Sequence, residues 1–334
     1  MSDLRLPALV DLRQLRFEDL EPLLEDEIRE WQHALDWDFR PSAELVRRFV
    51  RMQALNGFAL VSGARTVGYC YFVFEETKGL IGDLYVAQDH RCKENEDRLL
   101  GAVLQSLRSA PHLQRVESQL IMLSDSGLKP RDLPYDACAQ SYRRNFMIAP
   151  RHQAAGLQPA SPAAAVEYGS WHEGIQDAAA RLIARSYIGH VDSLINDQYR
   201  SIAGARRFLT NIIQYPGCGS FFQPASVHAT DPRTGRLCGI SLASLVSFDV
   251  GHITQICVDP EVKGRGIGYE MLRRSMQVLD GHGCRRVSLT VTGSNREAIR
   301  LYRGLGFQTL RTFDAHVWEA LQRQPQQPKA AGTP

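Results

Sequence analysis

The sequence predicts an α/β (α+β) protein built from two similar halves in tandem. The first observation is the segment 253–279, in which an apolar run is followed by a glycine-rich turn and then by apolar residues at helical spacing. This order predicts a strand, a tight turn and an amphipathic helix. The second observation is that residues 81–107 repeat the apolar positions of that segment at an offset of 172 residues, without a gap.

The repeat sets the expected domain boundaries. We expect the first half to span residues 1–152 and the second to span residues 163–321. Residues 154–164 are rich in Ala, Gly and Pro, which is typical of a linker. The tail 322–334 is polar and Pro-rich, and this composition predicts disorder.

Hydrophobic periodicity and turn residues predict the elements of the second half in order. We expect strands over residues 166–168, 253–258, 286–291 and 307–318, and a hairpin of two strands over 221–229 and 237–248. We expect helices over residues 175–187, 204–213 and 267–279. A further helix begins near Asn295, because Ser294 and Glu297 form a capping-box pattern. Gly306 lies where that helix should end.

Composition and net charge exclude several classes of function. Of 334 residues, 44% are hydrophobic and 23% are charged, as in ordinary globular proteins with room for two domains. The net charge of +2 argues against bulk binding to nucleic acid or to a membrane surface. We see no run of transmembrane length and no secretory pattern, and the seven cysteines lack C-x-x-C pairs. We therefore expect a cytoplasmic protein with no metal site.

The glycine-rich turn predicts an anion site. A glycine loop that opens a helix presents free backbone N–H groups at the positive end of the helix dipole, which suits a phosphate or pyrophosphate. The G-x-G-x-G spacing is neither the dinucleotide fingerprint nor a P-loop, and a turn without a ligand is the alternative. The residues concerned are Lys263, Gly264, Arg265, Gly266, Ile267 and Gly268.

A second motif lies downstream of the loop. Its members are Asn295, Ala298, Leu301, Tyr302, Gly306 and Phe307. Together the two segments resemble the Gcn5-related N-acetyltransferase (GNAT) superfamily, whose loop reads Q/R-x-x-G-x-G/A and whose second signature reads N-x-x-A-x-x-L-Y-x-x-x-G-F. The chain departs from the loop pattern in having Lys263, which keeps the charge but loses the planar fork of arginine. The resemblance covers residues 163–321, and the tandem layout is similar to that of mycothiol synthases.

This resemblance implies the fold and the reaction. Each half should be a mixed, mostly antiparallel twisted sheet flanked by helices. The second half should bind acetyl-CoA as co-substrate and transfer its acetyl group to a small-molecule or peptide amine by direct attack in a ternary complex. Besides the loop, the residues implied to hold the pantetheine arm are Ile256, Cys257, Val258 and Asn295. For Asn295 the alternative role is to N-cap the following helix, and the two roles are compatible. The alternative is a non-catalytic module that senses acyl-CoA or binds another protein.

The first half is expected to have lost the cofactor. Where the second half has Gly264, Gly266 and Gly268, the repeat places Cys92, Glu94 and Glu96. Side chains would occupy the space that a pyrophosphate needs, and two glutamates would repel it. We find no N-x-x-A-x-x-L-Y motif there.

Tyr302 is the predicted general acid. A tyrosine with a pKa of about 10 can donate a proton to a thiolate whose thiol has a pKa of about 8.5; the alternative is a core aromatic. Many GNAT enzymes carry a glutamate at the start of the central strand, where this chain has His252, so His252 is the predicted base. A strand-end histidine with an ordinary hydrogen bond is equally compatible, and Asp249 is another candidate.

The acceptor amine should lie over the polar loop after the first helix of the second half. The residues expected to contact it are Tyr187, His190, Asp192 and Asn196. A polar, partly acidic cluster suits a cationic or hydroxylated amine, whereas the alternative interpretation is a set of turn caps. The identity of the acceptor, the acyl chain length and the oligomeric state do not follow from the sequence.

Overall fold

The computed structural model describes residues 6–123, 132–151, 156–160, 166–215 and 217–319. The chain forms two compact units. The first unit consists of the described residues within 1–23, 47–141 and 314–334. The second unit consists of those within 24–46 and 142–313.

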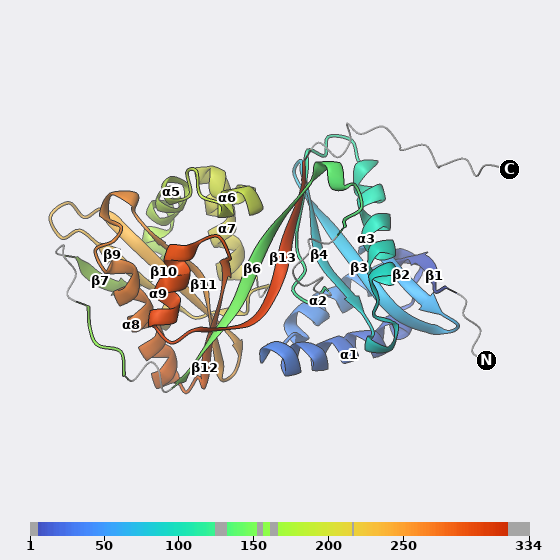
Figure 1. Ribbon diagram of the computed structural model, residues 1–334, viewed down its shortest axis with the longest axis horizontal. Coiled ribbons are helices and arrows are strands. Elements are labelled where there is room, and N and C mark those ends of the chain that lie inside the picture. Colours follow the sequence, from blue (N-terminus) through green and yellow to red (C-terminus); the bar gives the residue numbers. More distant parts are fainter. Residues whose placement is uncertain (1–5, 124–131, 152–155, 161–165, 216, 320–334) are drawn as a thin grey trace. The chain divides into compact units, whose positions relative to one another are not determined.

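The first unit is a six-stranded sheet with one main helix. Its strand order is β1-β2-β3-β4-β5-β13, and β4–β5 is parallel while the other pairs for which the register is known are antiparallel. Helix α3 packs its apolar face on this sheet (Figure 1). The elements are β1 (Ala8–Asp11), β2 (Asn56–Ser62), β3 (Arg65–Glu75), β4 (Lys78–Val86), α3 (Lys93–Arg108), β5 (Arg115–Gln119) and β13 (Gln308–Glu319), the last from Asp314 on.

The second unit has the same layout with more helices. Its strand order is β6-β12-β11-β10-β9-β7, with β8 paired to β10, and its parallel pair is β11–β12. Its strands are β6 (Ala139–Pro150, from Tyr142 on), β7 (Glu167–Ser170), β8 (Ser220–Phe221), β9 (Val227–Thr230), β10 (Leu237–Ser247), β11 (Val250–Val258) and β12 (Arg286–Thr292). Its helices are α5 (Gln176–Ser186), α6 (Asp192–Ile195), α7 (Ile202–Gln214), α8 (Ile267–His282) and α9 (Arg296–Gly304).

The structure confirms the repeat. Strands β3 and β4 start and stop 172 residues before β10 and β11, and the 3-10 turns Gln88–His90 and Pro260–Val262 keep the same offset. In both units the parallel pair covers four residues, starting at Lys78 with Arg115 in one and at Val250 with Arg286 in the other. The mixed, mostly antiparallel sheets expected from the resemblance are therefore present in both units.

The two halves exchange their last strands. Strand β6 follows the first half of the chain, yet Arg144–Pro150 pair antiparallel with β12 of the second unit. Strand β13 ends the described chain, yet Ala315–Glu319 pair antiparallel with β5 of the first unit. The boundaries expected from the repeat, 1–152 and 163–321, therefore separate strands from the sheets that they complete.

One predicted strand is broken. The sequence predicts a continuous strand over 221–229, but β8 ends at Phe221 and a 3-10 turn, Gln223–Ala225, precedes β9. Pro224 lies in this turn and has no N–H for a sheet ladder. The side chain of Ser226 bonds to the backbone instead, accepting from Ala243 N at 3.0 Å.

The start of α9 differs by one residue from the prediction. Asn295, rather than Ser294, is the N-cap, and its Oδ1 accepts from Ala298 N at 3.1 Å. The helix ends at Gly304, and Gly306 follows with φ of 88°, in the left-handed region that favours glycine after a helix. The predicted end of the helix is thus confirmed.

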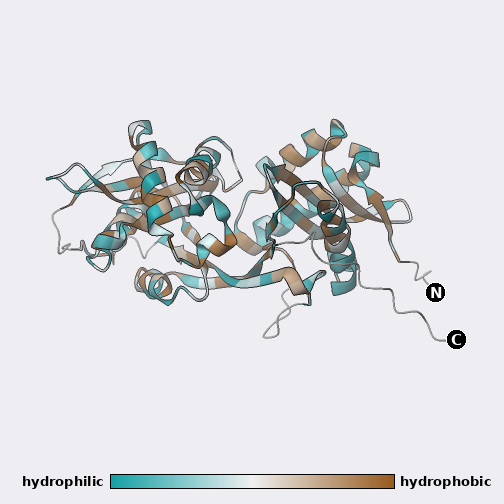
Figure 2. Cartoon of the chain, turned by 90° about the horizontal axis from the view of Figure 1, so that it is seen from above, coloured by the Kyte–Doolittle hydropathy of each residue, from teal (hydrophilic) through white to brown (hydrophobic). Residues whose placement is uncertain are grey.

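The apolar face of helix α8 is buried against the rest of the second unit. Met271, Leu272, Met276 and Leu279 are at most 1% exposed. Their counterparts on α3, Leu99, Leu100, Leu104 and Leu107, are all 0% exposed. Figure 2 shows that the helices carry both hydrophobic and hydrophilic residues, as expected for helices that cover one face of a sheet.

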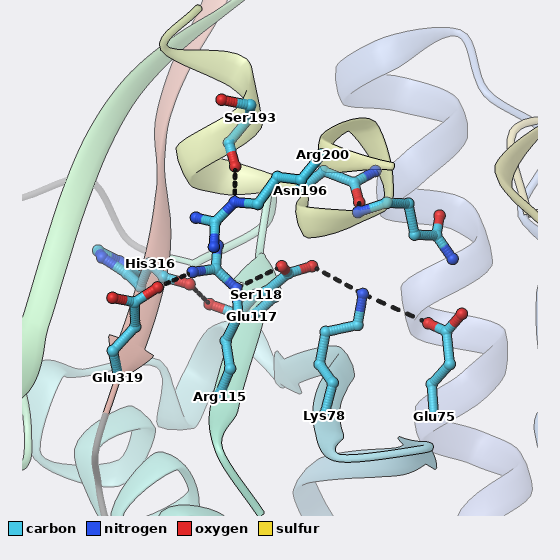
Figure 3. A network of polar contacts seen from close by, with 11 residues as sticks. Glu75, Lys78, Arg115, Glu117, Ser118, Ser193, Asn196, Arg200, His316 and Glu319 are labelled. Atoms are coloured by element: carbon cyan, nitrogen blue, oxygen red, sulfur yellow. Dashed lines mark hydrogen bonds and ion pairs between the residues drawn. The ribbon is translucent and has the colours of Figure 1, made fainter. Parts of the chain in front are cut away.

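The first unit buries a network of charges at the start of its parallel pair (Figure 3). Lys78 Nζ lies 3.4 Å from the carboxylates of both Glu75 and Glu117, and Arg115 Nε donates to Glu117 at 2.6 Å. Arg115 also pairs with Glu319 on β13. Because a buried charge is costly unless it is paired, this network ties β4, β5 and β13 together.

The tip of the N-terminal helix pair belongs to the second unit. Helices α1 (Phe17–Leu35) and α2 (Arg40–Arg51) meet at residues 36–39, within the segment 24–46. Trp37 is 8% exposed, and its ring centroid lies 5.1 Å from that of His252 and 6.4 Å from that of Phe146. Asp36 accepts from Arg285 Nη2 at 2.8 Å and also binds Arg286.

Among the described residues, no helix has both the length and the apolar character that a membrane span requires.

We expect Trp37→Ala to lower the free energy of unfolding by about 3–5 kcal/mol, because it removes a buried indole between Phe146 and His252. Urea unfolding measures this loss. Leu45→Ala, at a position 39% exposed within the same segment, is the control and should change stability by about 0.5 kcal/mol or less. Equal losses in the two variants would contradict the packing described here.

A fragment of residues 163–321 should not unfold cooperatively. It lacks β6, which leaves an edge of β12 unpaired, and it lacks Trp37. Calorimetry and size-exclusion chromatography of the fragment beside the full chain test this. A monomeric fragment with a sharp thermal transition would show that the second unit is complete without β6.

Candidate functional site

The sheet of the second unit opens between β11 and β12. The two strands pair from Val250 with Arg286 to Ile253 with Leu289, and the pairing stops there. A β-bulge in the β10–β11 pair falls at the same level, between Leu242 and Ala243. Bulges bend and twist a strand, so the bulge accounts for the divergence. The part of β11 after Ile253 thus has no ladder to β12, and this part includes the predicted pantetheine residues Ile256, Cys257 and Val258.

The glycine loop lies at the end of this opening and leads into α8. Gly264 and Gly266 have φ of 75° and 80°, a left-handed backbone that favours glycine. No side chain caps α8, and the backbone bond from Glu270 N to Gly266 O begins the helix. The N–H groups at the start of α8, including those of Ile267 and Gly268, therefore point out of the helix end, as an anion site requires.

The corresponding loop of the first unit is built differently. Its helix α3 starts after Cys92, whose φ of −152° is extended backbone rather than left-handed. Glu94 and Glu96 occupy the first turn, and Glu96 is 1% exposed. Two carboxylates at the positive end of the helix take the place of an anion, which supports the expectation that the first half does not bind the cofactor.

Part of the predicted linker, residues 156–160, lies beside the start of α8. Ala160 N donates to Glu270 Oε2 at 3.1 Å, and Tyr269 donates to Gln158 O at 3.0 Å. Glu270 also accepts from Arg273 and Arg274. Burial opposes ionisation of Glu270, but these donors, Arg273 foremost, lower its pKa to about 2.

Lys263 and Arg265 are the basic residues of the loop. Both side chains are exposed. They differ from Arg273 and Arg274, which Glu270 holds, and from Arg285, which Asp36 and Asp249 hold. Lys263 and Arg265 are thus exposed basic side chains next to the N–H groups at the start of α8.

Tyr302 lies on α9 and belongs to the same buried cluster as Ile253 of β11 and Val291 of β12. It is 6% exposed, and its ring packs edge-on against Phe307 with centroids 6.1 Å apart. Burial raises the pKa of Tyr302, and the Asp192 carboxylate raises it further while Arg144 lowers it. The raised pKa keeps the Tyr302 hydroxyl protonated, so it has a proton to donate.

A second group of side chains lies along β11. Gln255 is 5% exposed, and its Nε2 donates to the Tyr187 hydroxyl at 3.0 Å. The Tyr199 hydroxyl donates to its Oε1 at 3.3 Å. The rings of Tyr187 and Tyr199 stack with centroids 4.3 Å apart, and burial raises the pKa of both hydroxyls. This pair forms a rigid aromatic wall.

Asp192 is the charged centre of the cluster. It is the first residue of α6, and its carboxylate accepts from the hydroxyl of Thr292 at the end of β12. Arg144 on β6 lies 3.6 Å from the same carboxylate. The pKa values of Tyr302, Tyr187 and Tyr199 all respond to this charge. The structure thus brings Asp192 and Tyr302 into one electrostatic neighbourhood.

His190 and Asn295 meet at the same place. Asn295 Nδ2 lies 3.2 Å from His190 Nε2, while its Oδ1 caps α9. His190 Nδ1 lies 3.8 Å from the Asp192 carboxylate, and the His190 ring packs edge-on against Tyr187. Three of the four residues predicted for the acceptor therefore lie together.

Asn196 serves a turn in this structure. Its Oδ1 accepts from Gln198 N at 3.0 Å, which caps the 3-10 turn Asp197–Arg200. Arg200 Nε donates to Ser193 O at 2.7 Å and ties that turn to α6, as Figure 3 shows. These contacts match the turn-cap alternative for Asn196.

His252 lies in the core of the unit. It is 6% exposed, its Nδ1 is 2.9 Å from the Ser288 hydroxyl, and the rings of Trp37 and Phe146 pack on it. Burial lowers its pKa to about 4. A ring that stays neutral above this pH and lies away from solvent is poorly suited to take a proton from an amine, so this environment does not support the predicted role of His252 as base.

Some residues of the site have no signal in the sequence. Thr292, Arg144 and Gln255 belong to no motif, and strand pairing or the alternation along β11 places them. The contact of Trp37 with His252 joins residues more than two hundred positions apart. Among them only Gln255, a polar residue flanked by the apolar Ile253 and Ile256–Val258 of β11, could have drawn attention.

A glycine loop that leads into a helix without a side-chain cap, next to a central strand that diverges from its parallel neighbour, is the arrangement expected from the resemblance to acetyltransferases. Residues 191–307 match the acetyltransferase (GNAT) family, and this span holds the glycine loop, α9 and most of the acceptor cluster. The second half of the chain therefore carries a GNAT domain.

Comparisons over longer spans identify the tandem arrangement. The chain is 26% identical to a mycothiol acetyltransferase of Acidimicrobium ferrooxidans over 76% of this chain and 79% of that protein. A mycothiol acetyltransferase of Thermomonospora curvata is 34% identical, but the match covers only 26% of this chain and 29% of that protein. A solved tandem GNAT protein from the clavulanic acid biosynthesis pathway superposes with a TM-score of 0.64 at 17% identity, over 95% of this chain and 99% of that one. The fold is thus that of tandem GNAT proteins.

We expect Gly266→Glu to abolish acetyl-CoA binding, because a carboxylate would enter the cradle at the start of α8. Isothermal titration calorimetry measures the affinity. Gly283→Glu is the matched control: it lies at the other end of α8, also with positive φ (102°), and a Cβ there meets open space. Retained affinity in Gly266→Glu, or equal loss in both variants, would contradict the assignment of the loop.

Proposed function

We propose that this chain is an N-acetyltransferase that transfers the acetyl group of acetyl-CoA to an amine by direct attack in a ternary complex. The observation that carries the proposal is that Tyr302 belongs to the same buried cluster as Ile253, the residue at which the β11–β12 ladder stops, while the glycine loop follows β11 in the chain. An acyl-CoA sensor would need the loop but would not need a proton donor there, so the enzyme is the better explanation.

The proposed acetyl-CoA site uses backbone groups at both ends. The loop N–H groups would hold the diphosphate, with Lys263 and Arg265 adding charge. The free edge of β11 around Ile256–Val258 would hold the pantetheine arm, and an N–H there would stabilise the developing oxyanion. Cys257 is a core residue rather than a nucleophile, because it is 7% exposed and burial raises its thiol pKa to about 12.

Tyr302 would protonate the departing thiolate. The hydroxyl stays protonated across the working pH range, because burial raises its pKa. A proton that is needed only as the C–S bond breaks stabilises the transition state more than the ground state. This is the property that a general acid requires.

The acceptor would bind among Asp192, His190 and the stacked Tyr187 and Tyr199. A carboxylate suits an ammonium group, and an aromatic wall suits the apolar or hydroxylated part of a molecule. The acceptor is therefore proposed to be a small-molecule or peptide amine. We further propose a cytoplasmic enzyme, since all seven cysteines are free thiols.

The direct test is release of CoA thiol from acetyl-CoA in the presence of a panel of amines, including the acceptor used by mycothiol acetyltransferases. Product masses should show one added acetyl group on nitrogen. Acetyl-CoA that binds but is never consumed with any amine would favour the sensing module instead.

We expect Tyr302→Phe to keep acetyl-CoA affinity and to lower kcat by about 10²–10⁴-fold, because it removes only the proton donor. Steady-state kinetics and calorimetry measure the two quantities. Tyr215→Phe, at a position 59% exposed, is the control and should change neither. An unchanged kcat with a lower melting temperature would make Tyr302 a core aromatic.

A further inference from the structure

Arg144 is a nearly buried arginine whose side chain makes no hydrogen bond with any described residue. It lies on β6, opposite Thr292 of β12, and its side chain is 13% exposed. Within the described part of the chain its ion-pair partner is Asp192, whose Oδ1 lies 3.6 Å from Nη1. A guanidinium has five N–H donors, and burying them unused is costly. This position therefore favours an anion that comes from outside the chain.

Arg273, a buried arginine of the same unit, illustrates the usual arrangement. Its side chain is 9% exposed, and its Nε and Nη2 donate to the two carboxylate oxygens of Glu270 at 2.8 and 2.7 Å. Asp192 does not serve Arg144 in this way, because Oδ1, the atom nearest to Arg144, accepts from the Thr292 hydroxyl instead. A separation of 3.6 Å attracts the two charges but forms no hydrogen bond. The planar fork of Arg144 thus stays open to another anion.

The guanidinium belongs to the cluster proposed to bind the acceptor amine. Burial and then the Asp192 charge raise the pKa of Tyr199 and of Tyr302, and Arg144 lowers the pKa of both hydroxyls. Arg144 is therefore within electrostatic reach of the aromatic wall and of the proposed acid. Its contact with Asp192 places it at the charged centre of the cluster.

We propose that Arg144 binds a carboxylate of the acceptor, so that the acceptor is an amine with a carboxylate close to its amino group, as in a free amino acid. This inference rests on the proposed acetyl transfer and names the class of its acceptor. Such a zwitterion places one charge opposite each member of the pair, with its carboxylate at Arg144 and its ammonium group at Asp192. The two protein charges are as close to each other as the two charges of an amino acid.

The charge balance of the cluster favours a carboxylate over a phosphate. A phosphate monoester carries about 1.5 to 2 negative charges at neutral pH, and Asp192 would add another beside the same guanidinium. A carboxylate brings a single negative charge, and the ammonium group of the same molecule offsets Asp192. His190, whose Nδ1 lies 3.8 Å from Asp192, is the titratable neighbour on the other side of that carboxylate.

The first half of the chain supplies this specificity residue. Arg144 precedes the predicted linker, and the exchange of β6 brings it to the sheet of the second unit. It lies outside residues 191–307, which match the GNAT family, so that match does not account for it. The tandem layout thus gives the first half a part in choosing the acceptor.

The first test compares each acceptor with its own amide. Thiol release from acetyl-CoA is measured with the full chain and the proteinogenic amino acids, and then with the amide of each amino acid that reacts. We expect kcat/KM, corrected for the fraction of unprotonated amine, to be about 10- to 100-fold higher for the amino acid, as for a hydrogen bond between charged groups. Equal values for acid and amide, or faster transfer to O-phosphoethanolamine, would overturn the inference.

Variants of Arg144 separate recognition from support of the fold. Arg144→Gln should lower kcat/KM for the amino acid to about the value for the amide, and should leave the amide within about twofold. Arg144→Lys keeps the charge but loses the fork, so it should lie between the two. Arg181→Gln, at an exposed arginine of α5, is the matched control and should change neither. An equal loss toward acid and amide in both Arg144 variants would make Arg144 a structural residue and overturn the inference.

Calorimetry distinguishes failure of this inference from failure of the proposed function. Thiol release with amines but without preference for the carboxylate contradicts the inference alone. If the unaltered chain releases no thiol with any amine, the proposed function fails, and titration of the same amino acids into the full chain decides the rest. Binding that Arg144→Gln weakens by about 10-fold or more would support the carboxylate site, whereas no binding to the unaltered chain would overturn it.

Discussion

The divergence of β11 from β12 after Ile253 is the constraint on which the site depends. A sheet strand normally has its backbone groups paired on both sides, and nothing can bind along it. Here the edge of β11 that faces β12 becomes unpaired at the level of a β-bulge in the β10–β11 pair. The glycine loop, α9 and the polar cluster surround the unpaired part of β11. A continuous ladder between β11 and β12 would close the space between them.

The sequence predicted well those features that local chemistry determines. The glycine loop, the helix after it and Gly306 each require a particular residue at a particular backbone conformation, so they could be located within one or two positions. The repeat was visible because buried positions on β4 and β11 keep the same spacing. The break at Pro224 was missed because the apolar run around it resembles a strand.

The histidines show why the rest could not be predicted. Counting along the motif places His252 at the start of the central strand, but counting cannot tell that Trp37, from the other end of the chain, covers it. Nor can it tell that His190 turns one nitrogen toward Asp192 and the other toward Asn295. Whether a histidine lies in the core or among polar groups depends on long-range contacts, and these are not written in the local sequence.

The exchange of β6 and β13 also determines when the chain can fold during its synthesis. The sheet of the first unit waits for Ala315–Glu319, which are synthesised after β6 to β12, although its other strands are complete by Gln119. Contacts so distant in sequence slow folding, and β5 must meanwhile keep an unpaired edge. A nascent chain stopped before β13 thus lacks a strand of its first sheet, so the folding of the first unit depends on residues that follow the strands of the second unit.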